Sequence, residues 1–157
     1  MEILEIGRWI LECDPETTRE TFGKIPFGSP ETCPCNYCKN LVAARDKAYP
    51  EEALAIFEKL GIDSTKESET WEWTRLQSGV HSYGGFFHFV GSIVRGADAL
   101  QRTGTVGTFH LERTYDSFEY GFTRDTSLVP EVFNGYPVTQ LQFTTVVPGV
   151  IDVPDPD

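Results

Sequence analysis

The sequence predicts an α+β fold in which two consecutive helices pack on a mainly antiparallel sheet. Helical periodicity is concentrated between residues 36 and 61, and strand-like segments follow one another from residue 71 onward. Helices and strands that occupy separate parts of a chain are typical of α+β proteins. The 157 residues fit one domain, which we place at residues 1–149. We expect residues 150–157, an acidic Pro-Asp sequence, to form an extended tail.

The N-terminal segment is predicted to be strand. Residues 3–13 fit one face of a helix, but the alternation from Trp9 to Cys13 fits a strand, which we prefer. Residues 14–18 contain Asp-Pro and are expected to form a turn. Residues 21–27 are expected to form a short strand that leads to the cysteine-rich segment.

Two helices are predicted between residues 36 and 61. The first begins at Asn36 and ends near Tyr49, because the residue before a proline disfavours the helical conformation. Pro50 suits the start of the second helix, and Gly61 suits its end. The buried stripe of the second helix is expected at helical spacing: Leu54, Phe57 and Leu60.

The second half of the chain is predicted to form the sheet. The expected strands cover residues 71–76, 80–94, 105–115, 118–123 and 138–147. Residues 80–94 are apolar at both alternating sets of positions, which is typical of a strand in the middle of a sheet. We therefore expect this segment to be central.

The charge balance excludes some partners. With 24 acidic and 13 basic residues, the chain has a formal net charge of −11, which repels nucleic acids and anionic membranes. The same charge attracts a basic protein partner, although acidic surfaces also serve solubility alone. Residues 1–5 do not begin a signal peptide, and no apolar stretch is long enough to span a bilayer. We expect a cytoplasmic protein.

The densest chemical feature is a group of cysteines at the predicted start of the first helix: Cys33, Cys35 and Cys38. Zinc is commonly bound by four nitrogen or sulfur ligands in a tetrahedron, and closely spaced cysteines supply several of them. The missing ligand would come from Cys13, His81 or His88. If Cys13 closes the site it is structural, whereas an open fourth position would hold a reactive water.

Two other interpretations of the cysteines remain open. They are reduced thiols packed as small apolar groups, or Cys35 and Cys38 form a redox dithiol at a helix N-terminus. The expected strand and helix order lacks the parallel βαβ unit of thioredoxin-like sites, which counts against the redox interpretation.

Residues 80–91 form a second cluster, in which His81, Tyr83 and His88 are candidates for a ligand pocket. A histidine near a glycine pair can act as a base beside a bound ligand. The structural alternative for His88 is a hydrogen-bonded core histidine among aromatic residues. The sequence contains no Gly-x-Ser-x-Gly, phosphate loop or His-Glu-x-x-His motif, which favours a binding function over catalysis.

Acidic and aromatic residues are mixed between residues 109 and 136, where Phe109 and Glu119 are examples. Such a mixture suits a cleft for a cation or a sugar, and equally suits a sheet with acidic residues outside and aromatic residues inside. We assign these residues no role from the sequence.

Three motifs resemble those of an uncharacterised family of small bacterial proteins with no known activity. They are the Cys-x-Cys-x-x-Cys-x-Asn motif from Cys33, the Leu-Gly-Ile-Asp helix end at residues 60–63, and the His-x-Tyr-Gly-Gly-x-x-His-x-Val-Gly motif from His81. The ending Val-Pro-Asp-Pro-Asp is also similar. The resemblance covers most of the chain and implies a bacterial cytosolic origin, but it implies no function.

Three functional hypotheses follow. The first is a small binding or interaction domain whose cysteine cluster holds a structural zinc ion. The second is an acidic immunity-type inhibitor of a basic toxin. The third is a metal-dependent hydrolase with an open cysteine and histidine site.

Overall fold

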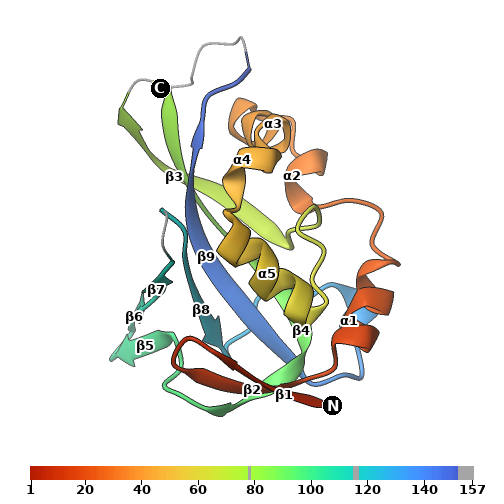
Figure 1. The fold of residues 1–157 in the computed structure, drawn as a ribbon. Helices are drawn as coiled ribbons and strands as arrows, with labels where there is room; N and C mark the ends of the chain where they lie inside the picture. The colour runs from red at the N-terminus through yellow and green to blue at the C-terminus, as the bar shows by residue number, and fades with distance from the viewer. Residues whose placement is uncertain (78, 115–116, 152–157) are drawn as a thin grey trace.

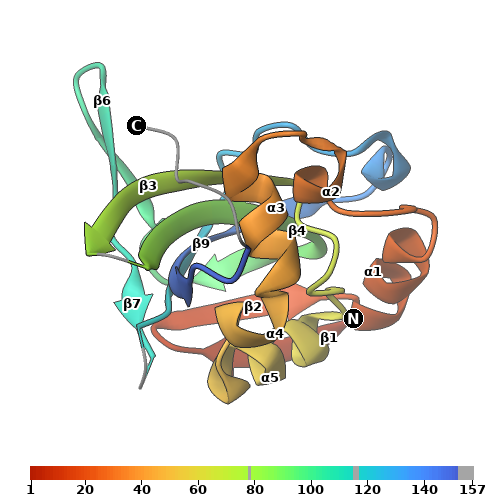
Figure 2. The same ribbon diagram turned by 90° about the horizontal axis from the view of Figure 1, so that it is seen from above.

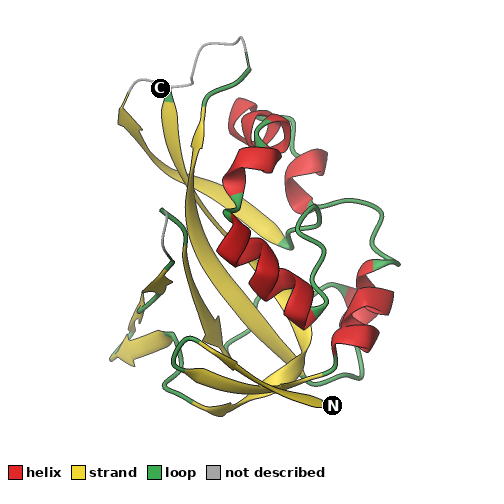
Figure 3. Cartoon of the chain, in the orientation of Figure 1, coloured by secondary structure: helices red, strands yellow, loops and turns green. Residues whose placement is uncertain are grey.

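A computed structural model describes residues 1–77, 79–114 and 117–151, and within these ranges the side chains of residues 74–77 are not described. Most of the expected tail at residues 150–157 therefore lies outside the described residues. The chain mixes helices with a mainly antiparallel sheet, which confirms the predicted class at this level (Figure 3). Within the described chain, no helix has the length and apolar character needed to cross a membrane.

Among the described residues the main sheet has seven strands, six of which follow one path. In spatial order these are β1 (Glu2–Ile6), β2 (Trp9–Cys13), β4 (Val80–Arg95), β9 (Val138–Pro148), β8 (Glu119–Thr123) and β7 (Glu112–Arg113). The seventh strand, β3 (Glu69–Gln77), pairs with the first half of β4, and β2 pairs with the second half. All these pairings are antiparallel, and β4 is the central strand that its apolar sequence predicted.

The two faces of β4 meet different neighbours. Phe87 points towards the helices, where its ring lies 4.9 Å from that of Phe57. Phe86 and His88 occupy the opposite face, because side chains alternate along a strand. Figure 1 shows the helices from α2 (Ser29–Thr32) to α5 (Glu51–Leu60) on one side of the sheet, and the hairpin of β5 (Leu100–Thr103) and β6 (Val106–Phe109) on the other. The main aromatic core therefore lies between the helices and one face of the sheet.

The first helix was not expected. Residues 14–18 were predicted as a turn and 21–27 as a strand, but α1 covers Pro15–Phe22. Asp14 caps this helix, because its Oδ1 accepts a hydrogen bond from the Thr17 backbone N–H at 3.1 Å. The Asp-Pro pair is thus a helix start, and the prediction of a turn and a strand was wrong.

The helices after α1 are α2 (Ser29–Thr32), α3 (Asn36–Ala43), α4 (Arg45–Ala48) and α5 (Glu51–Leu60). The single helix expected up to Tyr49 is thus two helices, interrupted where Ala44 leaves helical geometry with φ −102° and ψ 12°. The end of α5 is as predicted, because Gly61 adopts φ +82°. Its buried stripe differs in one position, since Leu54 is exposed and Ala53 is buried instead.

A small hairpin replaces part of the expected strand at residues 105–115. It consists of β5 (Leu100–Thr103) and β6 (Val106–Phe109), which pair with each other in a separate two-stranded sheet. Figure 2 shows β6 standing at the far side of the sheet from the helices. A short 3₁₀ helix, η1 (Glu131–Phe133), precedes β9.

Candidate metal centre

Three of the four cysteines meet at the junction of α2 and α3. Cys33 follows the last residue of α2, Cys35 is the N-cap of α3, and Cys38 lies in the first turn of that helix. Their Sγ atoms all lie within 4.8 Å of one another, and those of Cys33 and Cys35 are 3.2 Å apart. Tetrahedral zinc with Zn–S bonds of about 2.3 Å separates its sulfurs by about 3.8 Å. Small side-chain adjustments would therefore let the three sulfurs share one metal ion.

The thiols at this junction differ in acidity. Hydrogen bonds with Cys35 and Cys38 hold the pKa of Cys33 below its ordinary value. Burial, together with the neighbouring thiols, raises the pKa of Cys38 far above its ordinary value. Several thiolates at such short separations repel one another, so a divalent cation is needed before all three ionise. The cluster thus has the donor chemistry of a soft metal site.

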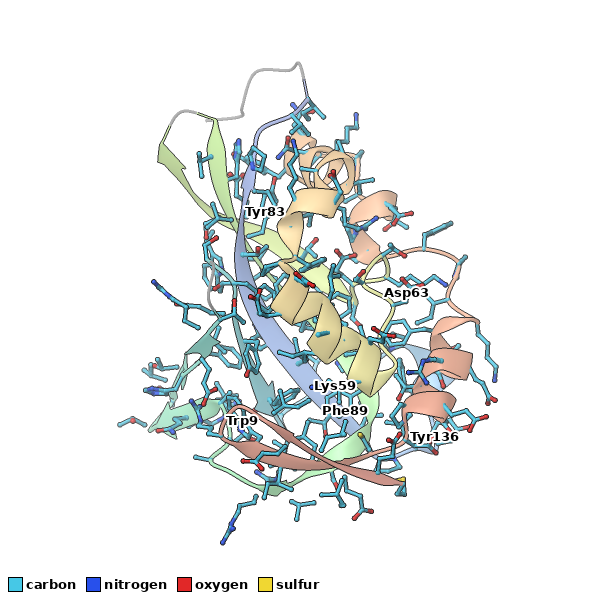
Figure 4. All side chains as sticks on the ribbon, in the orientation of Figure 1. Trp9, Lys59, Asp63, Tyr83, Phe89 and Tyr136 are labelled. Carbon is cyan, nitrogen blue, oxygen red and sulfur yellow. The ribbon has the colours of Figure 1, made fainter. Side chains whose placement is uncertain are left out.

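Cys13 does not join this group. It lies in β2 opposite Gly91 of β4, where it is fully buried, and burial raises its pKa to about 11. Gly91 is eight positions along β4 from Tyr83, the residue that contacts α3, which corresponds to about 26 Å of extended strand. Of the four cysteines predicted as metal ligands, three therefore lie together, and Cys13 is a distant core residue. Figure 4 shows Tyr83 beside the helices, and Phe89, close to Gly91 in sequence, towards the other end of the sheet.

The structure does not bring the three predicted pocket residues together. His81 and Tyr83 share one face of β4, with ring centroids 6.3 Å apart, whereas His88 lies on the opposite face. All three side chains are at most 2% exposed. His81 Nδ1 lies 2.5 Å from Glu72 Oε1, and His88 contacts Ser68 and Gln140. Their buried positions do not support the ligand pocket, which stays a prediction.

Tyr83 and Asn40 anchor the cysteine-bearing helix to the sheet. The Tyr83 hydroxyl donates to the carbonyl of Tyr37 at 2.9 Å and accepts from Asn40 Nδ2 at 3.4 Å. Asn40 also donates to the Pro148 carbonyl at 3.1 Å and accepts from the Val150 N–H at 2.7 Å. Burial raises the pKa of Tyr83 to about 12, so this hydroxyl stays protonated at neutral pH. The start of α3 is therefore joined to both β4 and the end of β9.

Asn40 ends the cysteine motif in the sequence, but no role was predicted for it. A polar residue at a position that the helix buries was the available signal, because buried amides are almost always hydrogen-bonded. Its partners lie 43 and 108 positions away in sequence, so they were not predictable from local pattern.

Comparison with known proteins identifies no relative. No protein-family model matches the chain, and neither the curated proteins nor the solved structures gave a match. The resemblance to a bacterial family therefore stays an untested expectation, and function has to be argued from the site itself.

Proposed function

We propose that this protein is a small binding domain in which Cys33, Cys35 and Cys38 hold a structural zinc ion. The observation that carries the proposal is the convergence of three Sγ atoms within 4.8 Å at the start of α3. Thiolates are preferred zinc ligands, and cysteines from a turn and the first turn of a helix are typical of structural sites. Among the described residues, no further cysteine, histidine or carboxylate belongs to the group, so water or a partner would supply the fourth ligand.

The structural role follows from what the cluster joins. The segment with the three cysteines connects α2 to α3, and α3 is held to the sheet through Tyr83 and Asn40. A metal ion bound here would fix the short α2 helix against α3. Because the unfolded chain has no preformed site, metal binding would add directly to the free energy of unfolding.

A metal-dependent hydrolase is the second candidate, because three protein ligands leave one position for a water molecule. Known catalytic zinc sites use ligand sets such as three histidines, two histidines with a glutamate, or two cysteines with a histidine. Three thiolates donate more negative charge, which makes a bound water less acidic. The donor set therefore favours the structural role.

The first experiment is metal content by plasma emission on freshly purified, reduced protein, with thiol titration before and after denaturation. We expect about one zinc per chain, with the clustered thiols protected until unfolding. Cys38→Ser should lose the zinc, whereas Cys13→Ala, its matched control, should retain it. Zinc affinity should fall as pH falls, because binding displaces the proton of Cys38, whose pKa is raised.

The same variants separate the two candidate roles. Under the structural proposal, Cys35→Ser lowers the free energy of unfolding together with the zinc content. Under the hydrolase alternative, Cys35→Ser would abolish activity and leave stability unchanged. Metal-free protein in which Cys33, Cys35 and Cys38 react in the native state would contradict both, whereas the buried Cys13 should react only on unfolding in either case.

A further inference from the structure

A hollow of about 590 Å³ lies on the sheet face opposite the helices. This volume falls within the range of about 300–1,000 Å³ that is usual for small-molecule sites. Gln142 and Thr144 of β9 line it, whereas Phe143 between them packs against Tyr49 on the helical side. The hollow is therefore separate from the cysteine cluster, which lies among the helices. Residues of β3 and β6 also line it.

Two exposed aromatic side chains line the hollow. Trp73 of β3 is 57% exposed and Phe109 of β6 is 37% exposed. The Trp73 indole lies directly over β4, because a Cβ atom built on Gly84 would come within 2.4 Å of its Nε1. Trp71 packs edge-on against Trp73, with ring centroids 5.6 Å apart. The absence of a side chain at Gly84 thus leaves room for the Trp73 indole, and the Trp71 ring packs against it.

A chain of hydrogen bonds fixes the polar floor. Gln140 Oε1 accepts from the Ser127 backbone N–H at 2.8 Å, which identifies this atom as the oxygen. His88 Nε2, 3.1 Å away, must then donate to the same oxygen, and His88 Nδ1 accepts from the Ser68 hydroxyl at 2.9 Å. Gln140 Nε2 donates to Gln142 Oε1 at 3.0 Å. The orientation of Gln142 is therefore set from the interior.

This orientation leaves a hydrogen-bond donor at the hollow. Gln142 Nε2 has no hydrogen-bond partner within the described chain, and it is not among the buried unpaired atoms there. A hydrogen-bond acceptor lies next to Gln142 on the same face of the sheet, because Glu119 of β8 pairs with Thr144, two residues further along β9. Glu119 Oε1 binds Arg113 at 2.8 Å, and Oε2 lies 3.4 Å from Thr144 Oγ1. The floor thus combines an amide donor, a carboxylate acceptor and a hydroxyl.

We propose that this hollow binds a neutral sugar ring. One face of a pyranose presents C–H groups that suit the rings of Trp73 and Phe109, while its hydroxyls both donate and accept. Those hydroxyls match Gln142 Nε2 as donor and Glu119 as acceptor. A negatively charged ligand is disfavoured by the net charge of −11. The binding domain would then recognise carbohydrate at a site remote from its metal centre.

The test is ligand-observed saturation-transfer NMR with methyl β-D-glucopyranoside, methyl α-D-mannopyranoside, N-acetyl-D-glucosamine and cellobiose, on the protein as purified. Adenosine and glucose 6-phosphate serve as probes of other classes. We expect at least one neutral sugar to bind and to change tryptophan fluorescence. Absence of binding by all four sugars would overturn the proposal, as would tighter binding of adenosine or glucose 6-phosphate.

Two variants assign the binding to the hollow. Gln142→Glu keeps an oxygen for Gln140 Nε2 but replaces the free donor with an acceptor, and Trp73→Ala removes the stacking surface. Each should weaken sugar binding by about tenfold or more. Tyr136→Ala, which truncates an exposed aromatic residue that does not line the hollow, is the matched control. Wild-type affinity in a folded Trp73→Ala protein would overturn the proposal even if Gln142→Glu fails to fold.

Discussion

Glu67 is 2% exposed, although it lies in a segment whose composition suggests a solvated loop. Its carboxylate binds Arg45 Nη2 at 3.0 Å and accepts from the Tyr49 hydroxyl at 2.7 Å. Burial, followed by the charge of Glu67, raises the pKa of Tyr49 well above its usual value, which keeps the hydroxyl a donor. The sequence cannot show this burial, because the two partners lie 22 and 18 positions away.

For His88, in contrast to Glu67, the sequence already suggested a buried position, and the consequence of that burial can be tested by changing the pH. The sequence is compatible with a pocket residue or a core histidine at this position. The side chain lies among Ser68, Gln140, Phe86 and Phe133, with no charged neighbour among these contacts. Burial lowers its pKa from 6.5 to about 4, so the neutral imidazole is the form that the fold accepts.

His88 should therefore make the fold sensitive to acid. Between its folded pKa of about 4 and its unfolded pKa of 6.5, the unfolded chain binds more protons. Its stabilising effect is complete above pH 6.5 and is lost as pH falls towards 4, to an extent of about 3 kcal/mol. Urea unfolding at about pH 7 and about pH 4.5 should show a smaller loss for His88→Gln than for the wild type.

The control for this effect is His110→Gln, which changes an exposed histidine. It should lose as much stability as the wild type when the pH falls. Equal losses for the wild type and His88→Gln would show that other groups cause the acid sensitivity.

At the scale of elements, periodic segments were predicted well and packing-dependent ones were not. The strand from Trp9 to Cys13 and the helix α5 have clear apolar periodicity, the central β4 is apolar on both faces, and all three are present. In contrast, α1 has the sequence Pro-Glu-Thr-Thr-Arg-Glu-Thr-Phe, with little apolar signal. It is held by tertiary contacts, such as the Val90 N–H donating to Thr18 Oγ1 at 3.0 Å. A contact between residues 72 positions apart cannot be predicted from the local sequence.

The junction between α5 and α1 gives a prediction at this scale. Gly61 has φ +82°, and a Cβ atom there would lie 2.2 Å from the backbone oxygen of Pro15. Gly61→Ala should therefore lower the free energy of unfolding by about 1–2 kcal/mol, because alanine is strained in the left-handed conformation. The clash of the new Cβ with backbone should lower it further. Gly104→Ala is the matched control, because Gly104 has φ +63° with no atom within 4 Å. Gly104→Ala should lower the free energy of unfolding, measured with urea, only by the strain of the left-handed conformation. Equal losses for the two variants would mean that the backbone at the junction of α5 and α1 shifts to accommodate the new methyl group.

For the whole molecule, the candidate sites differ in how far the sequence could predict them. Cys33, Cys35 and Cys38 are within six positions, so local spacing was enough to predict that they cluster. Cys13 required knowledge of which end of β4 the first hairpin meets. The hollow is assembled from four strands between residues 73 and 144, so only the folded sheet brings Trp73 to Gln142. The spacing of residues in the sequence is enough to predict a site such as the cysteine cluster, whereas the hollow depends on the order of the strands in the sheet.

The net charge of −11 acts on the whole molecule, and its effect can be measured without a partner. Like charges on a compact surface repel one another, which destabilises the folded state and favours association with a basic protein. The acidic-inhibitor hypothesis depends on this uncompensated field. Local ion pairs oppose it, among them Arg45 with Glu31 at 2.9 Å and the exposed pair of Arg113 and Glu119.

Salt should decide which of these opposing effects dominates. At about 0.1 M ionic strength the Debye length is about 10 Å, so added NaCl screens repulsion between distant charges. Because uncompensated acidic charge exceeds the paired charge, we expect NaCl to stabilise the fold by about 1 kcal/mol, which raises Tm by about 2–4 °C. Thermal unfolding in increasing NaCl measures this change in Tm. A fall in Tm with NaCl would mean that the ion pairs outweigh the repulsion, and would remove the basis for expecting a basic partner.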